Sequence, residues 1–243
     1  MHKHCFSLCL LFLTVATPSL ATECDSLPMP RYLFSFGASL RATAPLGDFG
    51  DRMDDVGKGI MMDLALVPTA GDWRYGLQIG YTMLAAESRV LDSMVLDIAH
   101  PERVVTTFAV DFGVPVTYSF PTESERWRTY VQAQAGLRWL LSIRTTIDLD
   151  IPGDDQYGFQ ERLSSTHALL YGAAVGTEYA ISPGFMIDAQ LQLLNSTRVA
   201  YLAPPPGDSG IPDTEFRAHR GGTPVVSLAV GLKLYLHRGK VRR

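Results

Sequence analysis

The chain has 243 residues, enough for one domain, and its 47% hydrophobic and 19% charged content is ordinary for a folded protein. Its formal net charge of −4 argues against a nucleic-acid partner, because such a partner usually requires a basic face. The glycines follow no period, so the composition indicates neither a collagen-like nor a disordered chain.

Residues 1–21 have the order of a secretory signal peptide. A basic start at Lys3 is followed by an apolar stretch that is too short to span a bilayer as a helix. Small residues then lead to Ala21, after which we expect cleavage, and residues 22–30 are expected to be flexible. Cys24 is then the single remaining cysteine, so the mature chain cannot form an intramolecular disulfide.

Beyond this stretch, apolar residues recur two apart rather than three or four apart, which is the period of a β-strand. No further apolar run is long enough for a membrane helix. In the last window, every second residue from Val226 to Leu236 is aliphatic and forms one face. The residues between them, which are mostly small and include Lys233, form the other face. Eight windows alternate in this way: 32–41, 60–66, 73–83, 108–118, 131–141, 169–181, 185–193 and 225–236.

The second face of these windows is mostly Gly, Ala, Ser and Gln, which suits the lining of a narrow barrel better than a surface in water. Lys or Arg facing lipid would cost about 2–4 kcal/mol at the bilayer midplane. Neither residue type lies in the apolar phase of any window. We therefore predict an all-β fold at 31–237, an eight-stranded antiparallel up-and-down transmembrane β-barrel, followed by a basic C-terminal tail at 238–243.

The connections between the windows alternate between short and long. Outer-membrane barrels combine short periplasmic turns with long external loops, so both termini are expected in the periplasm of a bacterium. Aromatic residues close to both ends of the windows predict two interfacial girdles. The short connections are 67–72, 119–126 and 182–184, and the long ones are 43–58, 86–102, 142–166 and 200–223.

Segment 37–49, and segment 73–81 with its W-x-x-G-x-x-x-G-Y order, resemble strands of small outer-membrane β-barrel domains of the OmpA-, OmpX- and OmpW-like kind. The resemblance implies insertion by the barrel-insertion machinery. It implies a fold more than a function, because that group is functionally mixed. Such barrels often end on an aromatic residue, whereas this chain continues as 237–243. Either Tyr235 and Leu236 carry the insertion signal, or insertion differs.

Charged residues of both signs fall in the inward phase of the predicted strands. About eight strands enclose an interior that side chains just fill. Buried charges must be compensated, so we predict a polar network that closes the lumen, with a narrow ion path as the alternative. The members of this predicted network are Arg41, Asp63, Arg74, Asp111, Arg138, Glu178, Asp188 and Lys233.

No motif assigns an activity. Our interpretation is a non-enzymatic, monomeric barrel in outer-membrane lipid, with a structural, adhesive or surface-binding role and an extracellular ligand at its loops. A conduit for a small apolar ligand is a second hypothesis, and a lipid-active enzyme is a third. The enzyme's candidate residues would be Ser164, Ser165, His167, His100 and His219.

No cofactor or metal is expected. Two predicted loops are acidic, at 48–55 and 148–155. Calcium favours clusters of carboxylates, but neither loop has the ligand spacing of a known calcium loop. Solvated loop charge is the preferred interpretation, with calcium binding as the alternative.

Overall fold

The structure is a computed structural model that describes residues 32–53, 56–67, 72–90, 102–121, 124, 126–147, 158–182, 184–203 and 217–237. The predicted signal peptide, the flexible stretch and the basic tail lie outside these residues, as does the acidic segment 148–155. In the described part of the chain, no helix is long and apolar enough to cross a membrane.

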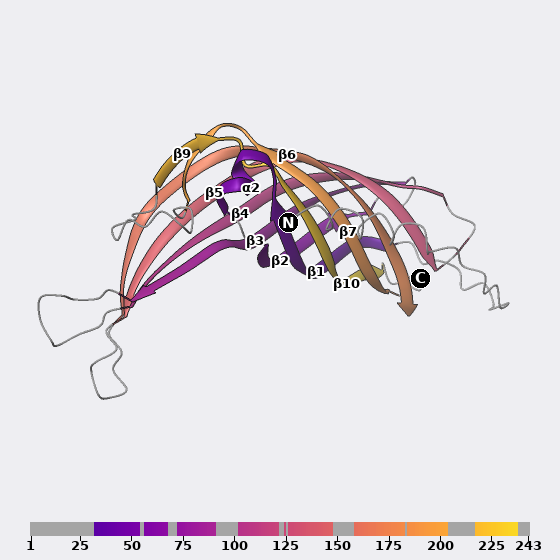
Figure 1. The fold of residues 1–243 in the computed structure, drawn as a ribbon. Coiled ribbons are helices and arrows are strands. Elements are labelled where there is room, and N and C mark those ends of the chain that lie inside the picture. The colour runs from indigo at the N-terminus through magenta and orange to yellow at the C-terminus, as the bar shows by residue number, and fades with distance from the viewer. Residues whose placement is uncertain are drawn as a thin grey trace, which may run out of the picture.

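Eight strands close into one antiparallel barrel in the order β1-β10-β7-β6-β5-β4-β3-β2 (Figure 1). Strands adjacent along the barrel path pair with each other, and β1 pairs with β10 to close it. The predicted eight-stranded antiparallel barrel is confirmed. Its strands are β1 (Tyr32–Pro45), β2 (Gly57–Leu66), β3 (Trp73–Val90), β4 (Glu102–Ser119), β5 (Trp127–Ile147), β6 (Gly158–Ser182), β7 (Phe185–Ser196) and β10 (Val225–His237).

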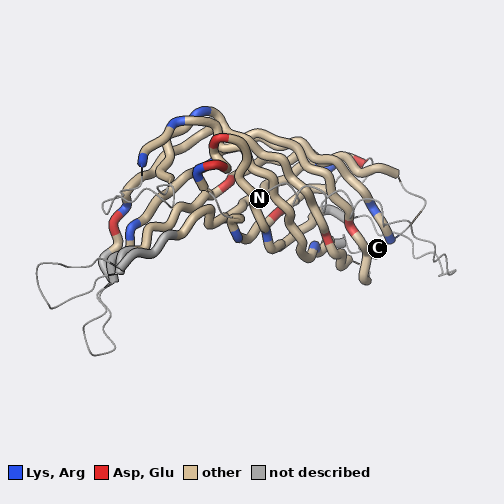
Figure 2. The backbone as a smooth tube through the Cα atoms, viewed as in Figure 1, with Lys and Arg blue, Asp and Glu red and all other residues tan. Residues whose placement is uncertain are grey.

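The period of two separates the outside of the barrel from its lumen. Large apolar side chains point outward on every strand, and Leu40 and Leu232 are 75% and 54% exposed. Their inward neighbours are small or polar, and Ser35 and Ser227 are fully buried. Long stretches of the barrel strands therefore carry no charge in Figure 2. The outside is an apolar belt, and the polar residues fill the inside.

Aromatic rings pair on the outside of the barrel next to the short turns. The ring centroids of Trp73 and Tyr118 are 5.0 Å apart, and those of Trp127 and Tyr179 are 4.8 Å apart. These pairs lie at the ends of strands that the short connections join. The described structure thus has an aromatic rim at its short-turn end.

Four strands run six or more residues past the ends of their sequence windows. β3 continues to Val90, β4 begins at Glu102, and β5 and β6 continue similarly, so the predicted loops 86–102 and 142–166 are wrong in their extent. The physical reason in two of them is a bulge: the β3–β4 register skips Leu84 of β3, and the β5–β6 register skips Leu163 of β6. A bulge inserts one extra residue, so the alternation changes phase there and a search for an unbroken period of two stops.

The predicted loops 43–58 and 200–223 contain regular structure that the sequence windows missed. The first holds α2 (Gly47–Met53), and the second holds a hairpin of β8 (Val199–Ala203) and β9 (Arg217–Gly221). Helix α2 has seven residues, too few to reveal a period of 3.6. Figure 1 shows α2 and β9 at the same end of the barrel, which we call the mouth.

Candidate functional site

The lumen is the candidate site, because the inward faces bring the chain's buried charges together there. Seven of the eight predicted network residues are buried, and Asp63 is partly buried. The structure divides them into two groups with no ion pair or hydrogen bond between the groups. Glu178, Arg74, Lys233, Asp188 and Asp63 form the Glu178 cluster, and Asp111, Arg41 and Arg138 form the Asp111 cluster.

The Glu178 cluster lies near the short-turn end, since Arg74 is the second residue of β3. The fully buried carboxylate of Glu178 accepts hydrogen bonds from Arg74 Nη1 at 2.5 Å and from Lys233 Nζ at 3.0 Å. The hydroxyl of Tyr235 donates to the same carboxylate at 2.8 Å. One carboxylate therefore compensates two bases inside the barrel.

Lys233 links three carboxylates in this cluster. Glu178 and Asp188 face each other directly across the β6–β7 pair, an arrangement that is destabilising for like charges alone. Lys233 Nζ offsets that repulsion at 3.0 Å from Glu178 and 3.5 Å from Asp188. Asp188 also accepts a hydrogen bond from the hydroxyl of Tyr130 at 2.9 Å. Asp63 is more distant, at 3.9 Å from the same Nζ.

The Asp111 cluster lies closer to the mouth and ties the wall to the last loop. Arg138 donates two hydrogen bonds to the carboxylate of Asp111, from Nε at 2.6 Å and from Nη2 at 3.0 Å. Bidentate pairs of this kind are among the strong hydrogen bonds of proteins. Arg41 Nη1 donates to the same carboxylate at 3.0 Å. Arg138 Nη1 also donates to the carbonyl of Thr223 at 2.7 Å. The cluster thus fixes the end of the segment that leads into β10.

Amide side chains occupy the lumen on other strands. Gln192 Nε2 donates to the amide oxygen of Gln78 at 3.1 Å, between β7 and β3. Thr117 donates to Gln132 at 3.2 Å, and Gln132 donates to Gln134 at 3.3 Å. All five of these side chains are buried. They fill the lumen with uncharged hydrogen-bonding groups.

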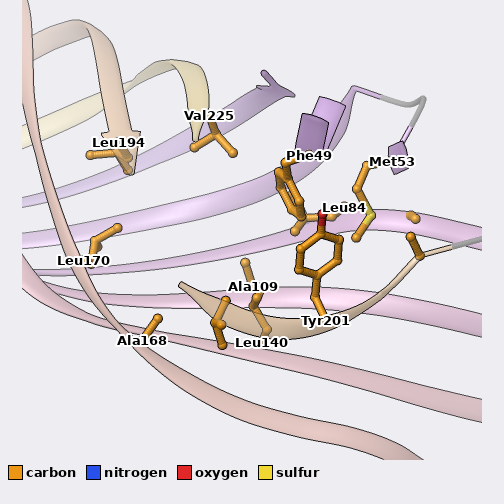
Figure 3. Packing of buried hydrophobic residues seen from close by; sticks show 13 residues of the cluster. Phe49, Met53, Leu84, Ala109, Leu140, Ala168, Leu170, Leu194, Tyr201 and Val225 are labelled. Carbon is orange, nitrogen blue, oxygen red and sulfur yellow. The ribbon is translucent and has the colours of Figure 1, made fainter. Parts of the chain in front are cut away.

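An apolar cluster fills the mouth. Phe49 and Met53 of α2 are each 1% exposed and belong to one buried cluster with Tyr201 of β8. The Phe49 and Tyr201 rings meet edge to face at 5.0 Å, and Leu84 of β3 lies beside them (Figure 3). Leu140 of β5 belongs to the same cluster. The first and last loops therefore fill the mouth of the barrel with apolar side chains.

A polar contact joins these two loops at the surface. Arg52 Nη1 of α2 donates to Nδ1 of His219 in β9 at 2.9 Å. Arginine has no acceptor, so the ring nitrogen must be unprotonated in this contact. Partial burial lowers the pKa of His219, and the neighbouring charges of Arg52 and Arg217 lower it further. Burial raises the pKa of Tyr201, with Asp48 acting in the same direction.

Of the residues named for an enzyme, those that the structure describes are not assembled into one site. Ser165 accepts a hydrogen bond from Trp139 Nε1 at 2.9 Å, and His167 packs edge to face on the same indole at 5.6 Å. Ser164 pairs with Ser142 in the β5–β6 register. His219 binds Arg52 instead, and His100 lies outside the described residues. The geometry of Ser165 and His167 is that of cross-strand packing.

Within the described ranges, no three His, Cys, Asp or Glu residues gather in a way that could hold a metal ion. Of the acids predicted to cluster at 48–55, Asp48 and Asp51 lie in α2, and 54–55 fall outside the description. The cavity found beside the Glu178 cluster measures about 20 Å³. That volume suits a single water molecule and is far below the size of a pocket for an organic ligand.

Several residues of the lumen were not anticipated from the sequence. Tyr130 and Tyr235 are hydrogen-bonded members of the Glu178 cluster, and Thr223 is a partner of Arg138. The inward phase of Tyr130 and Tyr235 was a usable signal, because a buried tyrosine hydroxyl normally finds a partner. Thr223 and the plug residue Phe49 lie outside the strands, where alternation carries no information.

Comparisons with known proteins give the following likenesses. No protein-family model matches the sequence, and no curated protein matches it. Among solved structures, the chain is similar to the neisserial surface protein NspA, at 13% identity, over 84% of this chain and 97% of that chain, with a TM-score of 0.45.

Two further structures are similar over most of the chain. Ail, the attachment invasion locus protein of Yersinia pestis, crystallised with the heparin analogue sucrose octasulfate, is 13% identical over 85% of this chain and 99% of that chain, with a TM-score of 0.43. The N-terminal β-barrel domain of Pseudomonas aeruginosa OprF is 16% identical over 82% and 97%, with a TM-score of 0.32. The function proposed for this chain therefore rests on its own residues.

Proposed function

We propose that the protein is a non-enzymatic, monomeric barrel of the bacterial outer membrane, with its short turns and both termini in the periplasm and its mouth outside the cell. The apolar belt supports the membrane setting, because outward Leu, Ile, Val and Phe side chains on a closed barrel suit hydrocarbon and leave no strand edge unpaired within it. Lys58, at the loop end of β2, is an exposed base in the outward phase, which suits a headgroup region.

The filled interior argues against a conduit. Charged and amide side chains occupy the lumen, and the Phe49–Tyr201 plug occupies the mouth. A small apolar ligand would need a dry path, and the cavity beside the Glu178 cluster is small and lined by charged residues. We therefore assign the binding role to the segments that extend beyond the membrane.

The observation that carries the surface-binding role is the unequal height of the strands. The β2–β3 pair ends at Met83, whereas β3 pairs with β4 as far as Val90. Residues 84–90 thus have a described strand partner on one side alone, over about 20 Å of strand. An exposed strand edge presents backbone donors and acceptors, to which an extended segment of another protein can add as a further strand.

The chain itself contacts the opposite edge of this extension, on β6, between Thr166 and Leu169. The amide of Thr197 donates to the carbonyl of Leu169 in β6 at 2.9 Å, and Thr166 donates to the carbonyl of Ala200 at 2.7 Å. The segment that leads into β8 therefore occupies the β6 side. Because the base of the β6 edge is occupied, we assign the addition of a partner strand to the β3 edge, from Leu84 to Val90.

Panning of a library of displayed extended peptides on the refolded barrel tests the binding role. Bound peptides are expected to slow amide exchange at 84–90, and a variant whose β3–β4 hairpin is shortened to end at Ala85 and Thr107 should lose them. Retained heat-modifiable gel migration shows that the shortened barrel still folds. Protection confined to other segments would refute the assignment to this edge.

Two measurements test the setting. In a Cys24→Ser background, intact cells should label Asp51→Cys in α2 and spare Asp72→Cys in a short turn; the reverse would overturn the orientation. In planar bilayers the refolded protein should show no steady conductance, and a persistent open pore would contradict a filled lumen.

A further inference from the structure

The cavity of about 20 Å³ beside the Glu178 cluster is lined by residues of seven barrel strands. Among them are Asp63 of β2 and Arg74 of β3, whose charges are opposite. Ser35 of β1 and Gln190 of β7 line it as well. One water molecule needs about 10–15 Å³ of such space and two to four polar partners.

Polar atoms without a partner surround this cavity. In the described structure, Arg74 Nε and Nη2, Ser35 Oγ and Gln190 Nε2 are buried and make no hydrogen bond. The other nitrogen of the guanidinium, Nη1, is already engaged by Glu178 and Tyr235. Buried polar groups in native proteins are nearly always hydrogen-bonded, to protein or to ordered water. Arg74, Ser35 and Gln190 therefore all lack a hydrogen-bond partner, and all three line the same cavity.

Asp63 supplies the complementary acceptor. Its carboxylate lies 3.9 Å from Lys233 Nζ, which is beyond hydrogen-bond distance, and it makes no hydrogen bond to a described residue. The same carboxylate lies where a side chain on Gly37 would have to begin, so glycine at that position leaves room for it. A carboxylate and a guanidinium that face one small cavity without touching are the usual setting for a bridging water.

We propose that this cavity is a binding site for one resident water molecule that joins Arg74 to Asp63. The water accepts hydrogen bonds from Arg74 and from Gln190 Nε2, and it donates to Asp63 and to Ser35 Oγ. Its two donors and two acceptors are then all used.

The charge count distinguishes water from an ion. The Glu178 cluster contains the bases Arg74 and Lys233 and the acids Glu178, Asp188 and Asp63, with Arg128 at 3.9 Å from Glu178 on its margin. The cluster is balanced when Arg128 is counted. Inside the cavity an added anion would face the carboxylate of Asp63, and an added cation would face Lys233 and the unpaired N–H groups of Arg74. A neutral molecule with both donors and acceptors avoids both repulsions.

This proposal concerns the lumen and is independent of the surface-binding role. A crystal structure that orders water, from crystals grown with bromide in place of chloride, tests it directly. The expected result is a peak without anomalous signal, within hydrogen-bond distance of Asp63 and of Arg74 Nε or Nη2. A bromide signal at that place, a dry cavity, or direct contact between Arg74 and Asp63 would each overturn the proposal.

Water-oxygen magnetic relaxation dispersion on the refolded barrel in micelles tests it in solution. Arg74→Lys removes the two unpaired nitrogens, so the count of long-lived waters should fall by one. Arg41→Lys, a matched change in the Asp111 cluster, should leave the count unchanged. Equal counts in the two variants would refute the site. If Arg74→Lys does not fold, Ser35→Ala should shorten the residence time of one water about fivefold, and an unchanged residence time would count against the site.

Discussion

Neutralising Glu178 tests the most densely connected point of the lumen. Glu178→Gln keeps the size of the side chain and removes its charge. The carboxylate now receives three donors, from Arg74 at 2.5 Å, Tyr235 at 2.8 Å and Lys233 at 3.0 Å. A glutamine offers one carbonyl oxygen and turns an N–H₂ group toward the remaining donors. Because Arg74 and Lys233 both contact Oε1, the carbonyl oxygen can keep both bases only if the N–H₂ group turns toward the hydroxyl of Tyr235. The two buried bases then face no negative charge at this position.

The magnitude follows from the burial of the cluster. Removing one partner of a buried ion pair costs about 3–5 kcal/mol, because the other charge stays buried without compensation. Glu178 is 0% exposed and Arg74 is 5% exposed, so water cannot easily take the place of the lost contact. An exposed pair is worth about 0–1 kcal/mol. Arg144 and Glu161 are such a pair, at 3.3 Å and with the Glu161 side chain 51% exposed.

Urea unfolding in lipid vesicles, followed by tryptophan fluorescence, measures the difference. Glu178→Gln should lower the free energy of unfolding by about 3–5 kcal/mol. The matched control Glu161→Gln should lower it by less than about 1 kcal/mol. Gel mobility before and after heating shows whether each variant forms a barrel at all. Equal, small losses in the two variants would refute the inference that the buried network stabilises the barrel.

Three further predictions concern the belt, the plug and the contact between the loops. Leu232→Arg, in the middle of β10, should cost about 2–4 kcal/mol in the same vesicles, and Leu236→Arg near the strand end about 0–1 kcal/mol; equal costs would mean that the belt does not face hydrocarbon. Phe49→Ala should lower the free energy of local unfolding of α2 by about 3 kcal/mol and speed amide exchange throughout the helix. Val56→Ala, at a residue that is 58% exposed, should do neither. The pKa of His219 is lowered from 6.5, so its contact with α2 is complete above that value and is lost as the pH falls through the folded-state pKa. The protection factor of the β9 amides, from which the intrinsic pH dependence of exchange is removed, should therefore fall on acidification and should not respond to pH in His219→Gln. A response that persists in that variant would assign the effect to another group.

The strands and their two faces were predictable because the side-chain period of a strand is local. Every second residue from Val226 to Leu236 points to the same side, whatever strand lies next to it. The sequence alone therefore indicates an apolar wall. The same logic put Arg74, Glu178 and Lys233 on the inward side. Where the backbone departs from the regular pleat, as after Met83, the local rule loses its phase and the predicted strand stops early.

Which charges meet was not predictable from alternation. Arg74 and Glu178 are 104 residues apart and meet across the lumen, while Asp111 and Arg138 are adjacent across one strand pair. Opposite charge leaves these pairings open, because every inward base could in principle compensate every inward acid. The closed register and the level of each residue along the barrel select the partners.

The sequence by itself determined the barrel, its apolar exterior and the presence of compensating charges inside, because these depend on the alternation and on residue type at each inward position. The tertiary structure alone decided that the charges separate into two clusters, that Phe49 and Tyr201 fill the mouth, and that β3 rises beyond β2. These features depend on contacts between segments far apart in the chain and on bulges that alter the register. Loops that follow no period could therefore be located from the sequence, but their packing into the barrel could not.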